Sequence, residues 1–370
     1  MNIMKVAYLL GSLNRGGTET LMLDVCQNLQ FTHFDATGIY RRGGALGDDF
    51  LKSGIPFTKL TPGKNIPKYL WNLRKMILKN QVEVIHAQQP LDALYARIAC
   101  IGMKVKQVLT FHGFDFNSSS AFTRYIIRRT DRNIFVSHYQ KEYYIRKYRL
   151  NPEKQTVVYN GINFSKFENF YNQNINHNLR KELNIKDSTL LMGMVGNFNE
   201  VRDQMTVCRF LKLLNEHAVD FHFVFVGKRV ESTPQRYDDC VEFCQKNNLS
   251  ERVIFAGVRS DVPAILFELD AFIYSTEHDT FGIAVVEAIA SGTPVFVNDW
   301  EVMNEITEDG KLAIIYKTKD EHDLLEKFML FLQKQDEYVR RAKENAVIVR
   351  KKYSVEKHIE NLKKVYISLY

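Results

Sequence analysis

Short apolar runs alternate with longer stretches of helical periodicity through nearly all of this chain of 370 residues. Such alternation is typical of strand–helix–strand units, in which each helix returns the chain to the same edge of a parallel sheet. The length is large for one domain and comfortable for two. We therefore predict an α/β fold made of two doubly wound, Rossmann-like domains.

The apolar runs place the elements of each half. In the first half we predict strands at Lys5–Gly11, Ala36–Tyr40, Val82–Ala87, Val105–Phe111, Asn133–Val136 and Thr156–Tyr159, with helices at Thr18–Leu29, Lys68–Lys79, Leu91–Ile101, Ala121–Arg129 and Tyr139–Tyr148. In the second half we predict strands at Leu190–Val195, Phe221–Val226, Val253–Ala256, Ala271–Tyr274, Pro294–Val297 and Leu312–Tyr316, and three closing helices at Glu321–Gln333, Tyr338–Tyr353 and Val355–Leu369. An Asn-rich polar run between the halves is typical of an interdomain linker. The predicted boundaries are 1–165, a linker at 166–186, and 187–354.

Composition limits the class of protein. A hydrophobic content of 45% and a charged content of 25% are those of a globular chain in water. No run approaches the roughly 18 apolar residues of a membrane-spanning helix, and the first residues are expected to form a strand rather than a signal peptide. The five cysteines are scattered and lack zinc-site spacing. We predict reduced cysteines and a cytoplasmic location.

Charge is distributed unevenly between the two halves. Residues 1–170 hold 24 Lys and Arg against 12 Asp and Glu, whereas residues 171–370 hold 26 against 31. A basic half predicts an anionic partner, such as a membrane surface, a phosphorylated acceptor or nucleic acid. Nucleic acid fits poorly because no recognition motif is present. Lys68 and Lys75 flank Trp71 in a predicted helix, which favours peripheral contact with an anionic membrane surface.

The segment Asp279–Glu287 carries the strongest chemical signal. Gly282 permits close approach of a ligand to the backbone, and the N–H groups of Phe281, Gly282 and Ile283 at a helix start favour phosphate. Glu287 lies about one turn further along the helix, where a carboxylate can hydrogen-bond hydroxyl groups. Amides that favour phosphate beside carboxylates that favour hydroxyls predict a nucleotide-sugar ligand.

This segment, continued by Gly292-Thr-Pro294, resembles the donor-binding motif of the retaining GT-B glycosyltransferases of family 4, also called glycosyl transferases group 1. The resemblance extends over nearly the whole chain through Asn160-Gly161-Ile-Asn163, Phe255-Ala-Gly257 and Lys352-Tyr-Ser354. It implies two facing domains with the donor site in the cleft between them. It also implies an acceptor-side first domain, a nucleotide-sugar-binding second domain, and a last helix, at about 355–370, that crosses back to the first domain.

The resemblance assigns roles in the second domain and reveals two departures. Asp279 stands where the family has Glu, so the charge is kept on a side chain one methylene shorter, and we expect it to hold the hydroxyls of the donor sugar. Asn197 stands where the family has Arg, and Arg202 stands at the Lys position, so Arg202 is the expected ligand of the diphosphate. Glu287 is expected to hold the ribose, and the backbone at Val258 and Arg259 to contact the base.

In the first domain the resemblance singles out a glycine loop and a histidine. Gly16 and Gly17 follow the first strand and are expected to approach the donor phosphate. His112 ends a central strand and is expected near the anomeric carbon, with His86 as a weaker candidate.

The reaction implied is transfer of a sugar from a nucleotide diphosphate, expected to be UDP, to a hydroxyl group with retention of configuration. No cofactor and no metal are expected, since no Asp-x-Asp occurs and Arg202 with helix amides replaces a metal at the diphosphate. The expected acceptor is a lipid-linked glycan in surface polysaccharide synthesis. Two alternatives stay open: a non-catalytic sugar-nucleotide-binding partner, and a GT-B sugar-nucleotide epimerase or hydrolase.

Overall fold

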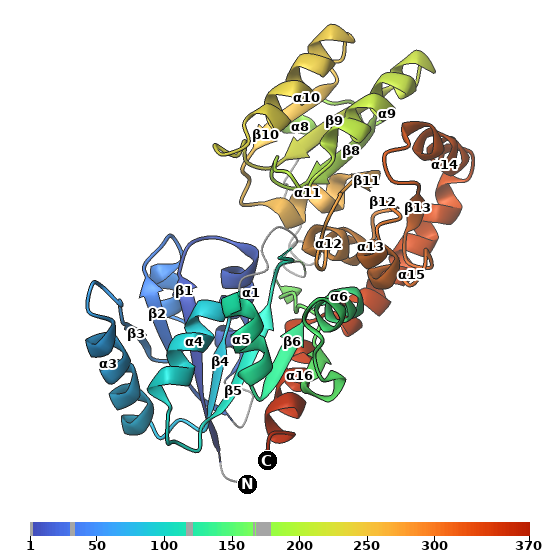
Figure 1. The fold of residues 1–370 in the computed structure, drawn as a ribbon. Helices are drawn as coiled ribbons and strands as arrows, with labels where there is room; N and C mark the ends of the chain where they lie inside the picture. The colour runs from blue at the N-terminus through green and yellow to red at the C-terminus, as the bar shows by residue number, and fades with distance from the viewer. Residues whose placement is uncertain (1–2, 30–33, 116–120, 166, 168–178) are drawn as a thin grey trace. The chain divides into compact units, whose positions relative to one another are not determined.

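Two compact units form the described part of the chain in a computed structural model (Figure 1). The structure describes residues 3–29, 34–115, 121–165, 167 and 179–370. Unit 1 comprises residues 1–162 together with 353–370, and unit 2 comprises residues 163–352. Most of the predicted linker at 166–186 lies outside the described residues.

Unit 1 is built on a parallel sheet of seven strands in the order β3-β2-β1-β4-β5-β6-β7. The strands are β1 (Met4–Ser12), β2 (Phe34–Arg42), β3 (Phe57–Lys59), β4 (Val84–Ala87), β5 (Lys106–Phe111), β6 (Arg132–Phe135) and β7 (Gln155–Val157). The strand order reverses between β1 and β4, which pair directly. The loops that follow these two strands therefore leave the same edge of the sheet in opposite directions.

Helices cover both faces of this sheet. They are α1 (Gly17–Asn28), α2 (Gly47–Leu51), α3 (Ile66–Lys79), α4 (Pro90–Ala99), α5 (Ala121–Arg129), α6 (His138–Tyr148), the 3₁₀ turn η2 (Pro152–Lys154) and α16 (Val355–Ile367). One buried cluster joins the sheet to α1 and α16. A second cluster joins the other face to α3, α4, α5 and α6. Both faces of the central strands are therefore buried, which explains why β1 and β4 are largely apolar in sequence.

The Asn-Gly pair predicted at the domain junction has a steric reason. Ile162 donates its N–H to Tyr353 and accepts the N–H of Val355, so two distant segments lie side by side. A Cβ on Gly161 would lie 2.7 Å from the Cα of Val355 and 2.7 Å from the Cβ of His358. Glycine is needed here because any side chain would separate the two segments.

Unit 2 repeats the arrangement with six parallel strands in the order β10-β9-β8-β11-β12-β13. The strands are β8 (Leu190–Val195), β9 (Phe221–Val226), β10 (Val253–Gly257), β11 (Ala271–Tyr274), β12 (Val295–Asn298) and β13 (Ile314–Tyr316). The helices are α8 (Leu179–Glu182), α9 (Gln204–Glu216), α10 (Gln235–Lys246), α11 (Val262–Glu268), α12 (Ile283–Ser291), α13 (Glu301–Ile306), α14 (Glu321–Gln333) and α15 (Gln335–Lys352). The order reverses between β8 and β11.

The prediction of two doubly wound parallel α/β domains is confirmed, and each predicted strand is present with small shifts at its ends. The edge strand β3 was not predicted. Its three residues, Phe57–Lys59, are too few to produce a recognisable apolar run.

Two histidines lie in the interior of unit 1. The His86 ring contacts the Tyr366 hydroxyl at 2.6 Å and the Thr110 hydroxyl at 2.6 Å, and His358 Nδ1 lies 2.7 Å from the carbonyl oxygen of Tyr159. Burial lowers the pKa of His86 to about 3 and that of His358 to about 4. Both rings are therefore neutral in the folded protein near pH 7.

We expect unit 1 to lose stability between pH 7.5 and pH 5.5. The unfolded chain binds protons on these histidines below a pKa of about 6.5, whereas the folded unit does not, so acid favours unfolding by about 1 kcal/mol for each ring. Thermal unfolding at the two pH values measures the loss. His358→Gln should reduce the pH dependence, whereas His322→Gln, an exposed position on α14, should leave it unchanged. An equal dependence in both variants would contradict the assignment.

Candidate functional site

The candidate residues of unit 2 gather where the strand order reverses. β8 and β11 are neighbours, and the segments 196–203 and 275–282 leave their carboxyl ends. Crevices at such reversals are the usual ligand sites of doubly wound sheets. The topology therefore brings Arg202 and Asp279 together although they are far apart in sequence.

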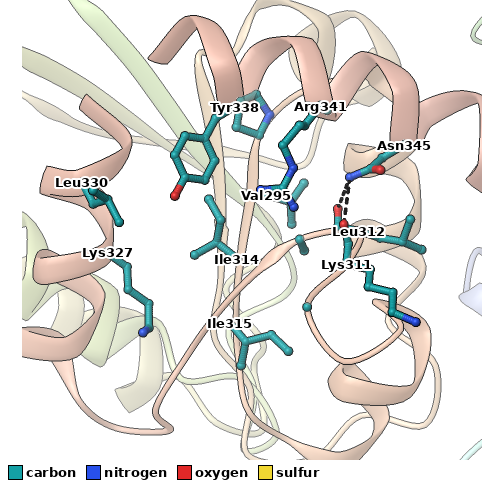
Figure 2. Close-up of a pocket in the computed structure, with 14 residues that line it drawn as sticks. Val295, Lys311, Leu312, Ile314, Ile315, Lys327, Leu330, Tyr338, Arg341 and Asn345 are labelled. Carbon is teal, nitrogen blue, oxygen red and sulfur yellow. Dashed lines mark hydrogen bonds between the residues drawn. The ribbon is translucent and has the colours of Figure 1, made fainter. Parts of the chain in front are cut away.

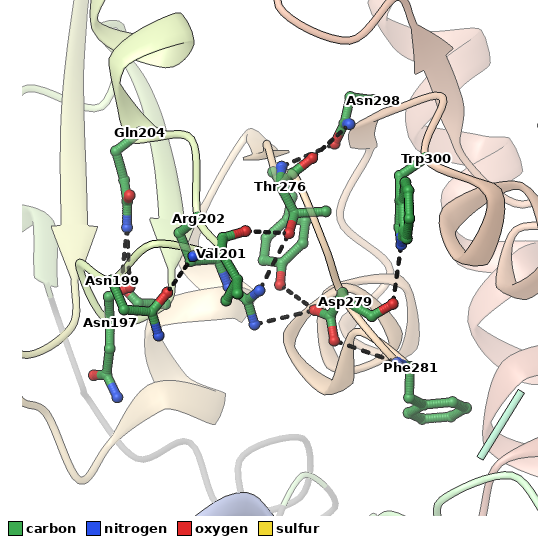
Figure 3. Close-up of polar contacts among 12 residues, drawn as sticks. Asn197, Asn199, Val201, Arg202, Gln204, Thr276, Asp279, Phe281, Asn298 and Trp300 are labelled. Atoms are coloured by element: carbon green, nitrogen blue, oxygen red, sulfur yellow. Dashed lines mark hydrogen bonds and ion pairs between the residues drawn. The ribbon is translucent and has the colours of Figure 1, made fainter. Parts of the chain in front are cut away.

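Arg202 and Asp279 form an ion pair at this edge (Figure 3). Arg202 Nη2 lies 3.0 Å from Asp279 Oδ2, and the two side chains are only 18% and 11% exposed. Arg202 Nη1 donates to the Thr276 hydroxyl at 3.2 Å, and the guanidinium lies 5.1 Å from the centre of the Tyr274 ring. Burial acts to lower the pKa of Arg202, but Asp279 and Tyr274 raise it overall, so the cation is firmly charged.

Asp279 is held by further contacts. The Tyr274 hydroxyl donates to Oδ2 at 2.6 Å, and the N–H of Phe281 donates to Oδ1 at 3.2 Å. The indole N–H of Trp300 donates to the backbone carbonyl of Asp279 at 2.9 Å. The carboxylate that was expected to face a sugar is thus largely engaged by the protein itself.

Asn197 braces the neighbouring loop. Its Oδ1 accepts the N–H of Lys228 at 2.9 Å, and its carbonyl accepts Gln204 Nε2 at 3.3 Å. The Asn197 side chain is uncharged. At this edge of the unit 2 sheet, Arg202 therefore contributes a positive charge and Asn197 does not.

Helix α12 begins and ends at glycines. Gly282, with φ of 79°, is the N-cap, and Gly292, with φ of 82°, is the C-cap. A left-handed backbone favours glycine at both positions, which explains why these residues delimit the helix in the sequence. Val285 makes the first backbone bond, to Gly282, so the N–H groups of Ile283 and Ala284 precede the intrahelical ladder.

Glu287 shares a face with this helix start. Within α12 only Ile283, Ala284 and Glu287 are partly exposed, and the other side chains are buried. Residues four apart lie above one another on a helix, so Glu287 projects from the same face as the side chain of Ile283, the first residue of α12.

Val258 and Arg259 follow β10. Val258 is 69% exposed. Arg259 donates to Glu182 at 2.6 and 2.9 Å and to Asp261 at 2.9 and 2.7 Å. Hydrogen bonds from these carboxylates raise the pKa of Arg259. The guanidinium is thus occupied, which leaves the backbone of this turn as the part available to a ligand.

The candidates of unit 1 lie after β1 and β5. Gly16 is the N-cap of α1, which begins at Gly17, and a Cβ on Gly16 would lie 2.8 Å from the Glu19 carboxylate. His112 Nε2 lies 2.8 Å from Gln88 Oε1, and Gln88 follows β4. Burial, with a smaller contribution from His358, lowers the pKa of His112 to about 3, so its ring is neutral near pH 7. His86 uses both ring nitrogens inside the core, which rules out the weaker candidate as a ligand-binding residue.

Two cavities of unit 2 differ in their relation to these residues. One, of about 260 Å³, adjoins Arg202 and is lined also by Arg209, Arg236, Glu277 and Lys319. The other, of about 300 Å³, lies between β13, α14 and α15 and contains none of the predicted site residues (Figure 2). We therefore locate the candidate site at the strand ends that carry Arg202 and Asp279, where Arg202 also lines the first cavity. Within the described residues, no group of three or more His, Cys, Asp and Glu could hold a metal ion.

Several residues that shape the site were not identified from the sequence. Tyr274 and Thr276 end or follow β11, and Trp300 follows β12, so each stands at a strand end, which is the one signal that marks them. Gly227 follows β9, and a Cβ there would lie 2.6 Å from the carbonyl carbon of Gly196 and 3.0 Å from the nitrogen of Asn197.

Comparison with known proteins matches both halves of the chain. Residues 15–166 match the model of Glycosyltransferase Family 4, and residues 176–348 match that of Glycosyl transferases group 1. A UDP-Gal:alpha-D-GlcNAc-diphosphoundecaprenol alpha-1,3-galactosyltransferase of Escherichia coli is 25% identical over 76% of each chain. An O-antigen biosynthesis glycosyltransferase of the same species is 22% identical over 87% of each.

Solved structures share the fold over the whole length. A glycosyltransferase from Rickettsia africae has a TM-score of 0.88 at 17% identity, covering 99% of this chain and 98% of its own. The Anabaena protein HepE, solved in complex with UDP, has a TM-score of 0.86 at 16% identity, covering 99% and 100%. At such identities the likeness concerns the fold alone.

We expect Gly227→Ala to displace the segment that carries Asn197 and Arg202. The added methyl group meets backbone rather than a flexible side chain, so we expect a loss of stability of about 1–3 kcal/mol and faster hydrogen exchange at residues 196–203. Gly257→Ala is the matched control, because its Cβ meets open space and its φ of 65° imposes only conformational strain. Unchanged exchange at residues 196–203 in Gly227→Ala would contradict the steric role.

Proposed function

Because this chain belongs to the glycosyl transferases group 1 family and has the GT-B fold, we propose that it transfers a sugar from UDP to a hydroxyl group with retention of configuration. The proposed acceptor is a lipid-linked glycan of a surface polysaccharide. The proposal includes no metal and no cofactor.

The observation that carries this proposal is the meeting of Arg202 with the start of α12. Arg202 presents a charged guanidinium, and α12 presents its first N–H groups, at the carboxyl ends of neighbouring strands. A cation and unpaired amides together favour a diphosphate. Glu287, on the same face of α12, is placed for the hydroxyls of the ribose.

In the proposed reaction the bond between the anomeric carbon and the phosphate oxygen breaks while the acceptor oxygen bonds to the same face of the sugar. The departing phosphate oxygen takes the proton of the acceptor. Arg202 and the α12 amides stabilise the negative charge that develops on the diphosphate. His112, neutral near pH 7, is proposed to lie near the anomeric carbon as a hydrogen-bonding group.

The choice of donor and acceptor follows the relatives. The Escherichia coli galactosyltransferase is named for UDP-Gal and a diphosphoundecaprenol acceptor, and HepE was solved with UDP. These names support UDP as the nucleotide and a lipid diphosphate as the carrier.

A non-catalytic sugar-nucleotide-binding protein is a second candidate. Asn197 stands where the family has Arg and carries no charge, and Asp279 stands where the family has Glu, so two donor positions differ from the family pattern. Such a protein would bind a nucleotide sugar and release nothing.

We expect release of UDP from a UDP-sugar to require a lipid-carrier acceptor and to persist in EDTA. Arg202→Ala should lower kcat/KM by about a hundredfold or more, since it removes a charge that stabilises the leaving group. Glu287→Ala should mainly raise KM. Lys246→Ala, an exposed position on α10, serves as control. Release of UDP without an acceptor would indicate an epimerase or hydrolase. Binding of the UDP-sugar without release of UDP would indicate the non-catalytic protein. NMR of the product reports the anomeric configuration.

A lipid-linked acceptor would place the enzyme at a membrane, and we propose that unit 1 contacts it through α3, α4 and α5. On α3, Trp71 is 58% exposed and lies between Lys68 and Lys75, which are also exposed, and Leu78, one turn further on, is 55% exposed. The Lys75 amine lies 5.5 Å from the Trp71 ring. Further exposed apolar side chains on or beside α4 and α5 are Leu91, Ile98, Ile101 and Tyr125.

This surface has the charge that an anionic bilayer requires. α3 and α5, both described throughout, contain no acidic residue, and Asp92 of α4 is buried against Arg41. Aromatic and aliphatic side chains among lysines are typical of helices that lie in a membrane interface. Separately, none of the helices within the described ranges has the length and apolar character needed to cross a bilayer.

We expect the protein to sediment with phosphatidylglycerol-containing vesicles and not with pure phosphatidylcholine vesicles. Replacing Lys68 and Lys75 with Gln should weaken binding about thirtyfold, at about 1 kcal/mol for each charge, and Trp71→Ala should weaken it further. Val347→Ala with Ile348→Ala removes exposed apolar groups from unit 2 as a control. Equal binding of all variants would exclude this surface.

A further inference from the structure

We propose that Asp279 positions Arg202 for the diphosphate and does not hold the donor sugar. The inference rests on the proposed function in one respect, namely that a nucleoside diphosphate is the ligand. It changes the role expected for Asp279 and adds Tyr274 and Thr276 as positioning residues.

The carboxylate of Asp279 has little capacity left for a sugar. Oδ2 accepts both the Tyr274 hydroxyl at 2.6 Å and Arg202 Nη2 at 3.0 Å, and Oδ1 accepts the N–H of Phe281 at 3.2 Å. A carboxylate offers about four acceptor positions, and this side chain is 11% exposed. At most one acceptor position, on Oδ1, therefore remains for a sugar hydroxyl, and burial of the side chain restricts access to it.

Arg202 in turn is fixed from three sides. Asp279 forms an ion pair with Nη2, Thr276 accepts from Nη1, and the Tyr274 ring lies beneath the guanidinium. Thr276 is oriented by donating its own hydroxyl to the carbonyl of Val201 at 2.6 Å. Because the guanidinium is already ordered, a diphosphate that binds it meets a preorganised cation.

The shorter side chain suits this role. Aspartate can accept the N–H of the residue two positions further on, as Asp279 does from Phe281, and so folds back on its own loop. The fully buried Tyr274 lies where its hydroxyl meets the carboxylate. Trp300 fixes the backbone of Asp279 from the next strand. The replacement of Glu by Asp thus accompanies a set of contacts directed toward Arg202.

Calorimetric titration of UDP and of UDP-glucose distinguishes the two roles. If Asp279 positions Arg202, Asp279→Asn weakens both ligands alike, by about tenfold, because the lost contact acts through the diphosphate. Tyr274→Phe, which keeps the ring and removes the hydroxyl, should weaken both to a smaller extent. If Asp279 holds the sugar, UDP affinity stays constant and only UDP-glucose affinity falls, which would overturn the inference and leave the proposed function intact.

Controls separate folding from binding. Asp220→Asn removes an aspartate that pairs with Arg252 at 3.1 Å at the amino end of β9, away from the site, and should change neither affinity. Thermal unfolding identifies variants that fail to fold. If Asp279→Asn is among them, the affinities of Tyr274→Phe for UDP and UDP-glucose are compared instead. If the unaltered protein binds none of UDP, GDP, ADP, dTDP or inorganic pyrophosphate, both the inference and the proposed function are wrong.

Discussion

The reversal of strand order between β8 and β11 is the constraint on which the site depends. Consecutive parallel strands are connected by a helical crossover. Where the strand order reverses, the crossovers that follow the two neighbouring strands run in opposite directions, so a crevice opens between their first loops at one edge of the sheet. One of these loops ends at Arg202 and the other contains Asp279. An isolated antiparallel β-bridge between Arg202 and Thr276 joins the two loops, and the ion pair and the Tyr274 ring order the charged side chains.

Features that depend on local chemistry could be predicted from the sequence. Gly282 and Gly292 delimit helix α12, because residues without a side chain readily adopt the left-handed backbone found at both ends. The position of Glu287 relative to Gly282 then made Glu287 a candidate ligand-binding residue. The parallel sheets follow from apolar runs buried on both faces. β3 has too few residues to show such a run.

Contacts that depend on tertiary structure could not be predicted in this way. His86 and His112 both stand at or near strand ends. Only the structure shows that the hydroxyl of Tyr366, from the far end of the chain, forms a hydrogen bond with the His86 ring. In the same way, the sequence contained no sign that Tyr274 and Arg202 converge on the Asp279 carboxylate. A pattern identifies a residue capable of a reaction, whereas its neighbours decide how much of that capacity remains.

The side-by-side path of Ile162 and Tyr353–Val355 has a consequence for synthesis of the protein. Unit 2 is continuous in sequence, but the core of unit 1 includes Val355, Ile359, Leu362 and Tyr366. A chain emerging from the ribosome can therefore complete its second unit before its first, against the usual order in which N-terminal domains fold earlier. Until α16 is made, the first 162 residues leave uncovered the apolar part of the sheet and of α1 that α16 packs against, which favours aggregation of the nascent chain during this interval.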